Sequence, residues 1–161
     1  MSNLTMPKID RKLISKKADI VADLKKIIKA ENILDHEDQV RPFETDALSA
    51  YKQKPLVVVF PENTEQVSKI LSYCNQEKIK VIPRGAGTGL SGGALPLADS
   101  LLLCLTKFNK IINIDYKNRC VVAQPGVTNL SITQAVEDKN FYYAPDPSSQ
   151  IACSIGGNVA E

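Results

Sequence analysis

The spacing of hydrophobic residues changes along this chain, and each spacing predicts a different structural element. In residues 18–30, hydrophobic side chains recur every three or four positions with lysines and aspartates between them, which predicts an amphipathic helix. Residues 56–60 form a continuous run of β-branched and other large hydrophobic side chains that Pro61 ends, which is typical of a buried strand. Residues 32–54 show no strong period, so we expect a connecting segment there.

The run at residues 56–60 opens a pattern of alternating strands and helices. Asn63 and Thr64 can cap a helix, and residues 80–82 form a second short strand, so together they predict a βαβ unit. The expected inward face of that helix consists of Val67, Ile70, Leu71 and Cys74. Further strands are expected at residues 101–105, 111–115 and 119–124.

The last third of the chain predicts one more helix and an ordered loop. Thr128 is suited to cap a helix that runs to Val136. From Ala144 onward, the proline, serine and glycine content predicts an ordered loop that leads to a further glycine turn.

Composition excludes several classes of function. The 161 residues fit one ordinary domain, and 20 Lys and Arg nearly balance 18 Asp and Glu, so the net charge of +2 gives no basis for a nucleic-acid partner. No run approaches the roughly 20 apolar residues that span a bilayer. The charged N-terminus also lacks the apolar core of a signal peptide, so we expect a cytoplasmic protein with no transmembrane segment.

Cysteine and histidine usage argues against metal and nucleophilic chemistry. The four cysteines form no CxxC pair, and we expect them to be reduced, structural thiols. His36, the only histidine, lies in the acidic sequence DHED, which is typical of a solvated loop. The sequence therefore indicates no metal ligand and no catalytic residue.

The densest group of glycines follows directly after the strand at residues 80–82, in the sequence VIPRGAGTGLSGG. Glycines permit positive φ angles and remove side chains, so successive backbone N–H groups can converge on one anion. The pattern predicts a pyrophosphate-binding loop. The alternative, a merely flexible surface loop, would rarely follow a buried strand so closely.

The same glycines also fit the pattern of a nicotinamide dinucleotide site. Gly87, Gly89 and Gly92 satisfy GxGxxG, and Asp115 stands at a strand end where a ribose-binding acid would be sought. That pattern requires a helix at its last glycine, whereas here Pro96 stands where the helix would run and the next strand follows almost at once. We therefore expect loop amides, and not a helix dipole, to hold the phosphate.

Four segments of the sequence together indicate a family. They are RPFETDALSAYKQKPLVVVFPENTEQV, IPRGAGTGLSGGALPL, VVAQPGVTNLSI and YYAPDPSSQIACSIGGNVAE, and they cover the chain from about Gln39 to its end. The chain resembles the FAD-binding domain of the vanillyl-alcohol oxidase and p-cresol methylhydroxylase (PCMH) superfamily. Within it, the chain is most similar to the glycolate oxidase flavoprotein subunit and the FAD-linked D-lactate dehydrogenases.

The resemblance implies a fold and a division of the chain. The fold would be α+β, a PCMH-type FAD-binding domain that is incomplete at its C-terminal end. Residues 1–38 would form an N-terminal helical segment, and residues 39–161 the N-terminal part of the FAD-binding domain.

The resemblance also implies two groups of residues around FAD. The pyrophosphate loop, acting mostly through backbone amides, would comprise Arg84, Gly85, Ala86, Gly87, Thr88, Gly89, Leu90 and Ser91. The flavin and its diphosphate linker would be lined by Pro145, Asp146, Ser148, Ser149, Gly156, Gly157 and Asn158. From the residues alone, the PDPSSQ motif also fits a local turn, and Asn158 also fits a left-handed turn residue. Gln124, Pro125 and Gly126 look like a strand end and turn, beside the cofactor or with a purely structural role.

Some members of the superfamily attach FAD to a histidine in the pyrophosphate loop. In this sequence Thr88 and small residues stand there, so the resemblance implies noncovalent FAD.

The implied activity is the oxidation of a small 2-hydroxy acid, glycolate or D-lactate, by hydride transfer to FAD. In the family, the residues that bind the acid lie beyond GGNVAE, so the acid would be a partner only of the complete enzyme and no catalytic residue is expected here. Two alternatives stay open. The chain is a noncatalytic truncated remnant, or it is a subunit of a split flavoenzyme that associates with other oxidase subunits or a downstream chain.

Overall fold

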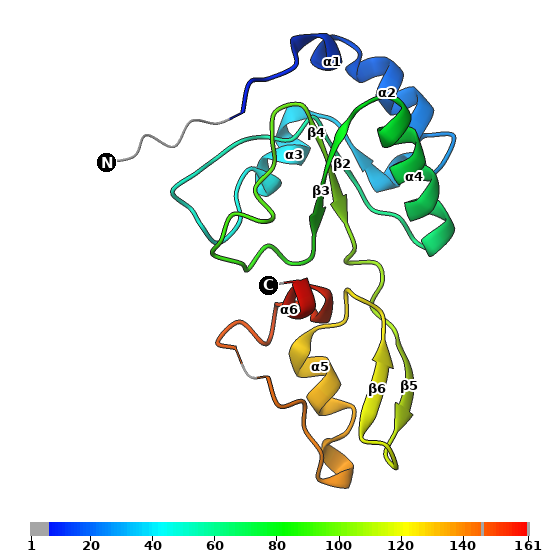
Figure 1. Cartoon of the computed structure of the whole chain (residues 1–161), viewed down its shortest axis with the longest axis vertical. Coiled ribbons are helices and arrows are strands. Elements are labelled where there is room, and N and C mark those ends of the chain that lie inside the picture. Colours follow the sequence, from blue (N-terminus) through cyan, green and yellow to red (C-terminus); the bar gives the residue numbers. More distant parts are fainter. Residues whose placement is uncertain (1–6, 146, 161) are drawn as a thin grey trace.

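The computed structural model describes residues 7–145 and 147–160. They form two parts that lie one above the other in Figure 1, an upper part around a four-stranded sheet and a lower part around a two-stranded sheet. The upper part contains α1 (Arg11–Ser15), α2 (Lys17–Leu24), η1 (Ala30–Asn32), β1 (Ile33–Leu34), α3 (Glu37–Val40), η2 (Arg41–Phe43), β2 (Val57–Val59), α4 (Thr64–Gln76), β3 (Lys80–Arg84) and β4 (Ser100–Cys104). The lower part contains β5 (Ile111–Asp115), β6 (Cys120–Ala123), α5 (Asn129–Gln134), η3 (Glu137–Lys139) and α6 (Ile155–Ala160).

The upper sheet contains the expected βαβ unit with another strand inserted into it. The strand order is β1-β2-β4-β3, and β4 pairs in parallel with both β2 and β3. Because parallel strands end at the same edge of a sheet, β2, β3 and β4 all have their carboxyl ends at the edge from which the chain continues into the lower part (Figure 1).

Both faces of the upper sheet are buried, as parallel strands require. Alternate residues of β2 and β4 point to opposite faces. The face toward α2 and α4 is formed by Val57, Val59, Leu101 and Leu103, which pack with Leu24 and Ile70. The opposite face is formed by Val58, Leu102 and Cys104, which pack with Val40 and Phe43.

The N-terminal third is more structured than the hydrophobic pattern predicts. The helix expected at residues 18–30 ends at Leu24, although Ile28 beyond it is still buried. Residues 32–54 are not only a connecting segment, because they include β1, α3 and η2. The pairing of Ile33 with Val59 adds β1 to the sheet in antiparallel orientation. β1 lies before residue 38, and the division of the chain at that residue stays a prediction.

α4 confirms the predicted cap and corrects one predicted core residue. The Asn63 side chain accepts a hydrogen bond from the Gln66 backbone N–H at 2.9 Å, as an N-cap residue does. Ile70 and Cys74 are buried, but Leu71 is 44% exposed. The inward stripe is centred on the i, i+4 pair of Ile70 and Cys74, and Leu71 lies beside it.

The lower part confirms the predicted strands and corrects the predicted glycine turn. β5 and β6 form an antiparallel hairpin, and the Thr128 side chain accepts from the Ser131 N–H to cap α5. The glycines Gly156 and Gly157 lie in a short helix, α6, where the Asn158 N–H donates to the Ser154 carbonyl at 3.0 Å. Asn158 is therefore helical and not a left-handed turn residue.

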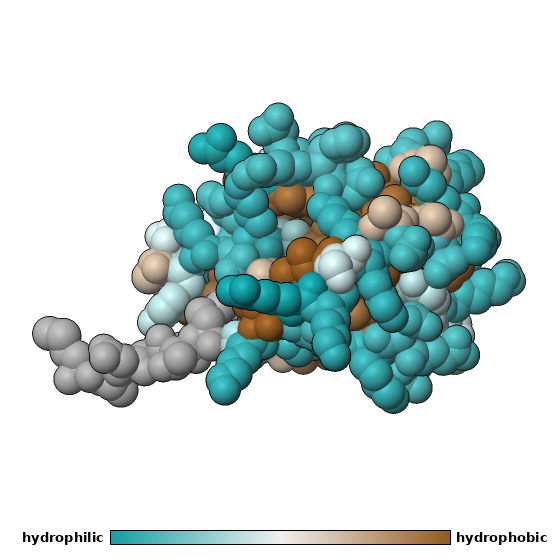
Figure 2. Space-filling model, turned by 90° about the horizontal axis from the view of Figure 1, so that it is seen from above, coloured by the Kyte–Doolittle hydropathy of each residue, from teal (hydrophilic) through white to brown (hydrophobic). Residues whose placement is uncertain are grey.

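The surface around the N-terminal helices is mainly hydrophilic. Seen from the end that is uppermost in Figure 1, charged and polar residues cover most of this face, and hydrophobic residues show between them (Figure 2). Within residues 7–145 and 147–160, no helix has both the length and the apolar character to cross a membrane.

Candidate functional site

The glycine-rich loop connects β3 to β4 at the carboxyl edge of the upper sheet. Residues 85–99, all of which are described, contain turns and no helix, so the expected absence of a crossover helix after Gly92 is confirmed. A turn closes there instead, with the Leu95 N–H donating to the Gly92 carbonyl at 3.1 Å. Asp115 lies in the β5–β6 hairpin and accepts from the Asn118 N–H, so it acts in a local turn. These contacts do not support the nicotinamide pattern.

The backbone of this loop offers hydrogen-bond donors that the protein itself does not use. Within the part of the chain that the structure describes, none of the N–H groups of residues 85–93 donates to a protein acceptor. Gly87 has a φ of 75° and Gly92 a φ of 78°, in the left-handed region that favours glycine. Unused amides in such a backbone are suited to an anionic ligand.

The lower part closes against the start of this loop. A Cβ atom on Gly85 would overlap the Ser154 Oγ, so these residues touch and a side chain at position 85 would have to displace this hydroxyl. The Ile155 N–H donates to the Val127 carbonyl at 2.8 Å, and the Gly156 N–H donates to the Pro125 carbonyl at 2.9 Å. Ser154 and the first turn of α6 are thereby fixed between the loop and the turn after β6, beneath the upper sheet (Figure 1).

A cavity of about 400 Å³ lies where the two parts meet. It is lined by Ala86, Thr106, Asn109, Gly126, Val127, Thr128, Ser131, Ala152 and Ser154. Five of these nine residues have a hydroxyl or amide side chain, which can donate to phosphate or sugar oxygens or accept from sugar hydroxyls.

Gly126 sits where two backbone segments come too close for any side chain. Its N–H donates to the Phe108 carbonyl at 2.7 Å. A Cβ atom on Gly126 would overlap the Leu105 carbonyl oxygen and lie 2.8 Å from that of Phe108. Gly126 therefore both holds the lower part to the chain after β4 and lines the cavity.

Of the eight residues expected in the pyrophosphate loop, Ala86 lines this cavity and Gly85 borders it through Ser154. Leu90 and Ser91 are exposed to solvent. Arg84 is directed elsewhere: its side chain is buried beneath the loop and donates to the Thr45 carbonyl at 2.8 Å.

None of the described members of the second group of expected residues lines this cavity. The Pro145 carbonyl accepts from Asn129 Nδ2 at 2.8 Å, and Asp146 lies outside the described residues. Ser148 is exposed, and the Ser149 carbonyl accepts from two backbone N–H groups in a local turn. The three remaining members, Gly156, Gly157 and Asn158, lie in α6, where Asn158 Nδ2 is buried without a hydrogen-bond partner among the described residues.

Several cavity residues were missed by the sequence reasoning, among them Thr106, Asn109, Ser131 and Ser154. Thr106 and Asn109 follow the carboxyl end of β4, next to the loop that follows β3. Ligand sites in parallel sheets gather at this edge, so the strand prediction itself carried the signal. For Ser131 and Ser154, no pattern in the sequence indicates the contact.

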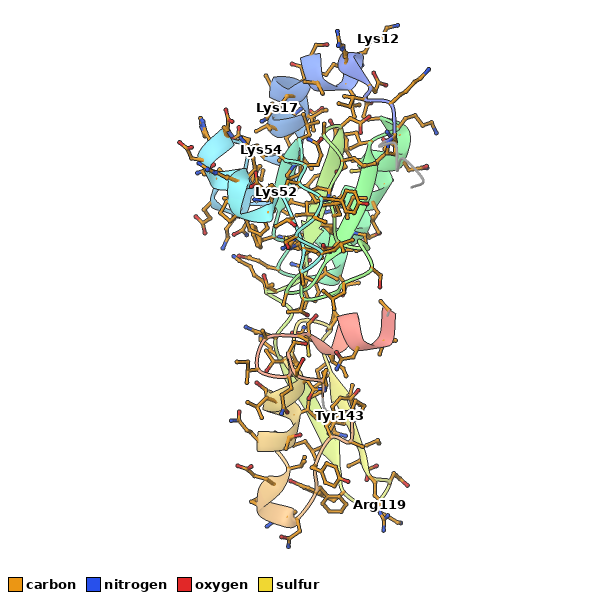
Figure 3. The ribbon with its side chains drawn as sticks, turned by 90° about the vertical axis from the view of Figure 1, so that its left-hand side faces the viewer. Lys12, Lys17, Lys52, Lys54, Arg119 and Tyr143 are labelled. Carbon is orange, nitrogen blue, oxygen red and sulfur yellow. The ribbon has the colours of Figure 1, made fainter. Side chains whose placement is uncertain are left out.

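Cys104, the last residue of β4, is a buried thiol that pairs in register with Arg84. Burial raises the pKa of the Cys104 thiol to about 12, although Arg84 acts in the opposite direction, so this thiol stays neutral at pH 7. Lys12, Lys17, Lys52 and Lys54 all lie in the upper part, and Arg119 and Tyr143 lie in the lower part away from the junction (Figure 3). Among the described residues, no group of three or more His, Cys, Asp or Glu side chains is arranged to hold a metal ion.

Comparison with known proteins decides the family. Residues 55–161 match the profile of a family described as FAD binding domain. The chain belongs to this family. The cofactor that the sequence implied, FAD, is thus confirmed at the level of the family.

The relatives of this FAD-binding domain are much longer chains. It is 49% identical over 156 residues to the glycolate oxidase subunit GlcD of Escherichia coli K12, covering 97% of this chain and 30% of that one. It is 36% identical over 161 residues to the D-lactate dehydrogenase of Anaerostipes hadrus, covering 99% of this chain and 32% of that one. The chain thus spans about 30% of the length of these relatives.

The fold of the FAD-binding domain is also that of a solved PCMH structure. The chain superposes on p-cresol methylhydroxylase with a TM-score of 0.78 at 24% sequence identity, covering 94% of this chain and 30% of that one. The expected α+β, PCMH-type fold is confirmed.

The residues at the junction fit the chemistry of FAD. The dinucleotide carries a diphosphate, which suits backbone N–H groups that have no protein acceptor, as those of residues 85–93 have none within the described part of the chain. It also carries ribose and ribityl hydroxyls, which match hydroxyl and amide side chains such as Thr106 and Asn109.

Proposed function

We propose that this chain is the FAD-anchoring part of an oxidoreductase that oxidises a small 2-hydroxy acid, glycolate or D-lactate, by hydride transfer to the flavin. Two findings support this proposal: the chain belongs to the FAD-binding family, and its sequence is similar to proteins named glycolate oxidase subunit and D-lactate dehydrogenase. When bound, FAD supplies the redox chemistry, and the residues of this chain bind and orient it.

One observation carries the proposal: the run of backbone N–H groups in residues 85–93 that have no protein acceptor within the described part of the chain. This run borders a polar cavity at the carboxyl edge of a parallel sheet, where dinucleotides commonly bind. The diphosphate is proposed to lie against the loop that begins at Gly85. The second group of expected residues, around Pro145 and Asn158, is proposed to face the rest of the cofactor.

Attachment of FAD is proposed to be noncovalent. Thr88 stands in the loop where some superfamily members have a histidine. His36, the only histidine of the sequence, caps α3 in a different segment and its side chain is 83% exposed. Denaturation with acid should therefore release all of the flavin into solution.

The test is a pair of measurements on the purified chain. FAD is added in excess, free cofactor is removed, and the retained flavin absorbance is measured; dye reduction is then followed with glycolate and with D-lactate. We expect weak FAD binding and no turnover, because the chain spans about 30% of the length of its relatives and the residues that bind the acid are proposed to lie in the remaining part. Stoichiometric flavin with substrate-dependent turnover from this chain alone would contradict the proposal.

A second candidate is favoured by the surface of the lower part. An apolar groove of about 300 Å³ lies between the β5–β6 hairpin and α5, lined in part by Tyr116, Phe141 and Tyr143. Tyr142, which also lines the groove, is 73% exposed, and Val122, between two lining residues of β6, is 50% exposed. A two-stranded sheet is only marginally stable by itself, and an exposed apolar surface is typical of a site where another polypeptide binds.

The candidate function is therefore a subunit of a split flavoenzyme or, without a partner, a noncatalytic remnant. To distinguish the two, the chain is mixed with a separately expressed polypeptide that corresponds to the remaining length of the relatives, and FAD binding and turnover are measured. Turnover that appears only in the mixture supports the split enzyme. Absence of FAD binding in both the chain and the mixture supports the remnant. Either version is proposed to act in the cytoplasm, which cell fractionation tests.

A further inference from the structure

Arg84 occupies an unusual place for a basic residue next to a phosphate-binding loop. It is the last residue of β3, paired with Cys104 of β4, and only 9% of it is exposed. Its side chain lies on the face of the sheet that carries Phe43, and the guanidinium Cζ is 5.7 Å from the centre of the Phe43 ring. The guanidinium is therefore beneath the loop and does not line the cavity.

The guanidinium connects three segments that are far apart in the sequence. Its Nη1 donates to the Thr45 carbonyl at 2.8 Å and to the Ala94 carbonyl at 3.4 Å. Ala94 follows the last glycine of the loop, whereas Arg84 precedes the first. One planar side chain thus ties both ends of the loop to the segment after η2.

The same guanidinium fills the space where Gly87 would carry a side chain. A Cβ atom on Gly87 would lie 2.5 Å from Arg84 Cζ and 2.9 Å from Nε. Gly87 also has a φ of 75°, so its backbone conformation and the position of the guanidinium depend on each other. The middle of the loop rests directly on the Arg84 side chain.

The charge of Arg84 is not neutralised by an ion pair within the described part of the chain. Buried cations are usually paired with carboxylates, whereas this one is held by carbonyl oxygens and an aromatic ring. This arrangement depends on the planar guanidinium, because a compact lysine ammonium cannot lie over the Phe43 ring in the same way while it donates to both carbonyls.

We propose that Arg84 is a positioning residue, whose guanidinium holds the backbone of residues 85–93 in the conformation that receives an anionic diphosphate and does not itself contact the cofactor. The proposal rests on the proposed function of this loop in binding FAD. It assigns to the side chain a role different from that of the backbone amides around it.

Two variants separate position from charge. Arg84→Lys keeps the charge and loses the planar guanidinium, and Arg84→Met loses both while keeping a long side chain. Lys80→Met is the matched control, because Lys80 lies at the opposite end of the same strand and pairs with buried Asp99 at 2.8 Å. It should lower stability without affecting residues 85–93.

The first measurement needs no ligand. Order parameters from ¹⁵N relaxation of the loop amides should fall from about 0.85, typical of rigid backbone, to below about 0.6 in both Arg84 variants. Those of β4 should stay unchanged, and Lys80→Met should leave the loop values at the wild-type level. Unchanged loop values in Arg84→Met, or a lower melting temperature as the only effect, would overturn the proposal.

The second measurement is FAD affinity by titration of the same proteins. Both Arg84 variants should bind at least about tenfold more weakly, the change expected from one charge-assisted hydrogen bond. Wild-type affinity in Arg84→Lys would show that charge alone suffices and would overturn the positioning role. If the loop loosens in the variants but even the wild-type chain binds no FAD, the proposed function fails and the positioning of the loop by Arg84 stands.

Discussion

Replacing Gly87 with valine should remove most of the affinity of this chain for FAD. A β-branched residue at a φ of 75° is strained by about 1–2 kcal/mol or more. The valine side chain must also displace the Arg84 guanidinium, because the distance from the new Cβ to Arg84 Cζ would be only 2.5 Å. The hydrogen bond to the Thr45 carbonyl that is then lost contributes about 1.5–3 kcal/mol as a charge-assisted bond.

Partial relaxation of an exposed loop reduces this sum, so we expect a net loss of about 3 kcal/mol in binding free energy, or roughly 150-fold in Kd. The assay is titration of the purified chain with FAD, followed by flavin fluorescence, with urea unfolding to show that the variant is folded. Gly93→Val is the comparison within the same loop and should lose less affinity, because a Cβ atom on Gly93 would meet no other atom within 4 Å and this residue has no positive φ. A Kd for Gly87→Val within threefold of wild type, or an equal loss in Gly93→Val, would refute the reasoning.

Three further predictions test the junction of the two parts, the contacts of Glu62 and the choice of cofactor. Gly126→Ala should lower the free energy of unfolding by about 2–4 kcal/mol in urea titrations, because its Cβ would meet the backbone carbonyls of Leu105 and Phe108; a loss no larger than that of Gly93→Ala would contradict this. Hydrogen bonds from Asn32 and Lys107 lower the pKa of Glu62 from 4.5 to about 2, so the stability that ionised Glu62 contributes should be present above pH 4.5 and lost as pH falls toward 2. The melting temperatures of wild type and Glu62→Gln should therefore converge over that range, and a constant difference would disprove the linkage. Titration with NADH should give no saturable binding at FAD-saturating concentrations, since no helix follows Gly92 within residues 85–99; tight NADH binding that FAD displaces would restore the nicotinamide interpretation.

Local signals in the sequence predicted the elements whose formation depends on near neighbours. The caps at Asn63 and Thr128 and the hydrophobic run that became β2 are all found in the structure. Their hydrogen bonds and side-chain alternation involve residues within a few positions, so a pattern of that length contains the needed information.

Elements that depend on distant contacts were not predictable in this way. β1 has only two residues and forms because Ile33 and Leu34 pair with β2. α6 contains two glycines, which disfavour helix, and its first turn is held by hydrogen bonds to Pro125 and Val127 from another segment. In each case the tertiary contact outweighs the local preference of the residues.

In the candidate site, too, the parts that depend on local sequence were predictable and the parts that depend on distant contacts were not. The glycine-rich loop was predictable, because the sequence itself shows the glycines, which lack side chains and leave the backbone amides accessible. The opposite wall was not, because Ser154 reaches the cavity only after the chain has folded back across the sheet edge. The buried course of Arg84 was also not predictable, since the same residue on a solvent-facing loop would point at a phosphate.

The insertion of β4 between β2 and β3 has a consequence for how this protein acquires its structure. β2 and β3 have no hydrogen bonds with each other, so residues 56–84 cannot close into a sheet by themselves, even though α4 links the two strands closely. Both must wait for residues 100–104, which follow the glycine-rich loop in the chain. The loop is therefore closed by the same late event that joins the sheet, and its long-range pairing raises the contact order and slows folding. Until β4 emerges from the ribosome, which adds about 5–20 residues per second, β2 can pair only with β1 and β3 has no partner strand. A chaperone would bind the chain in this interval of a few seconds.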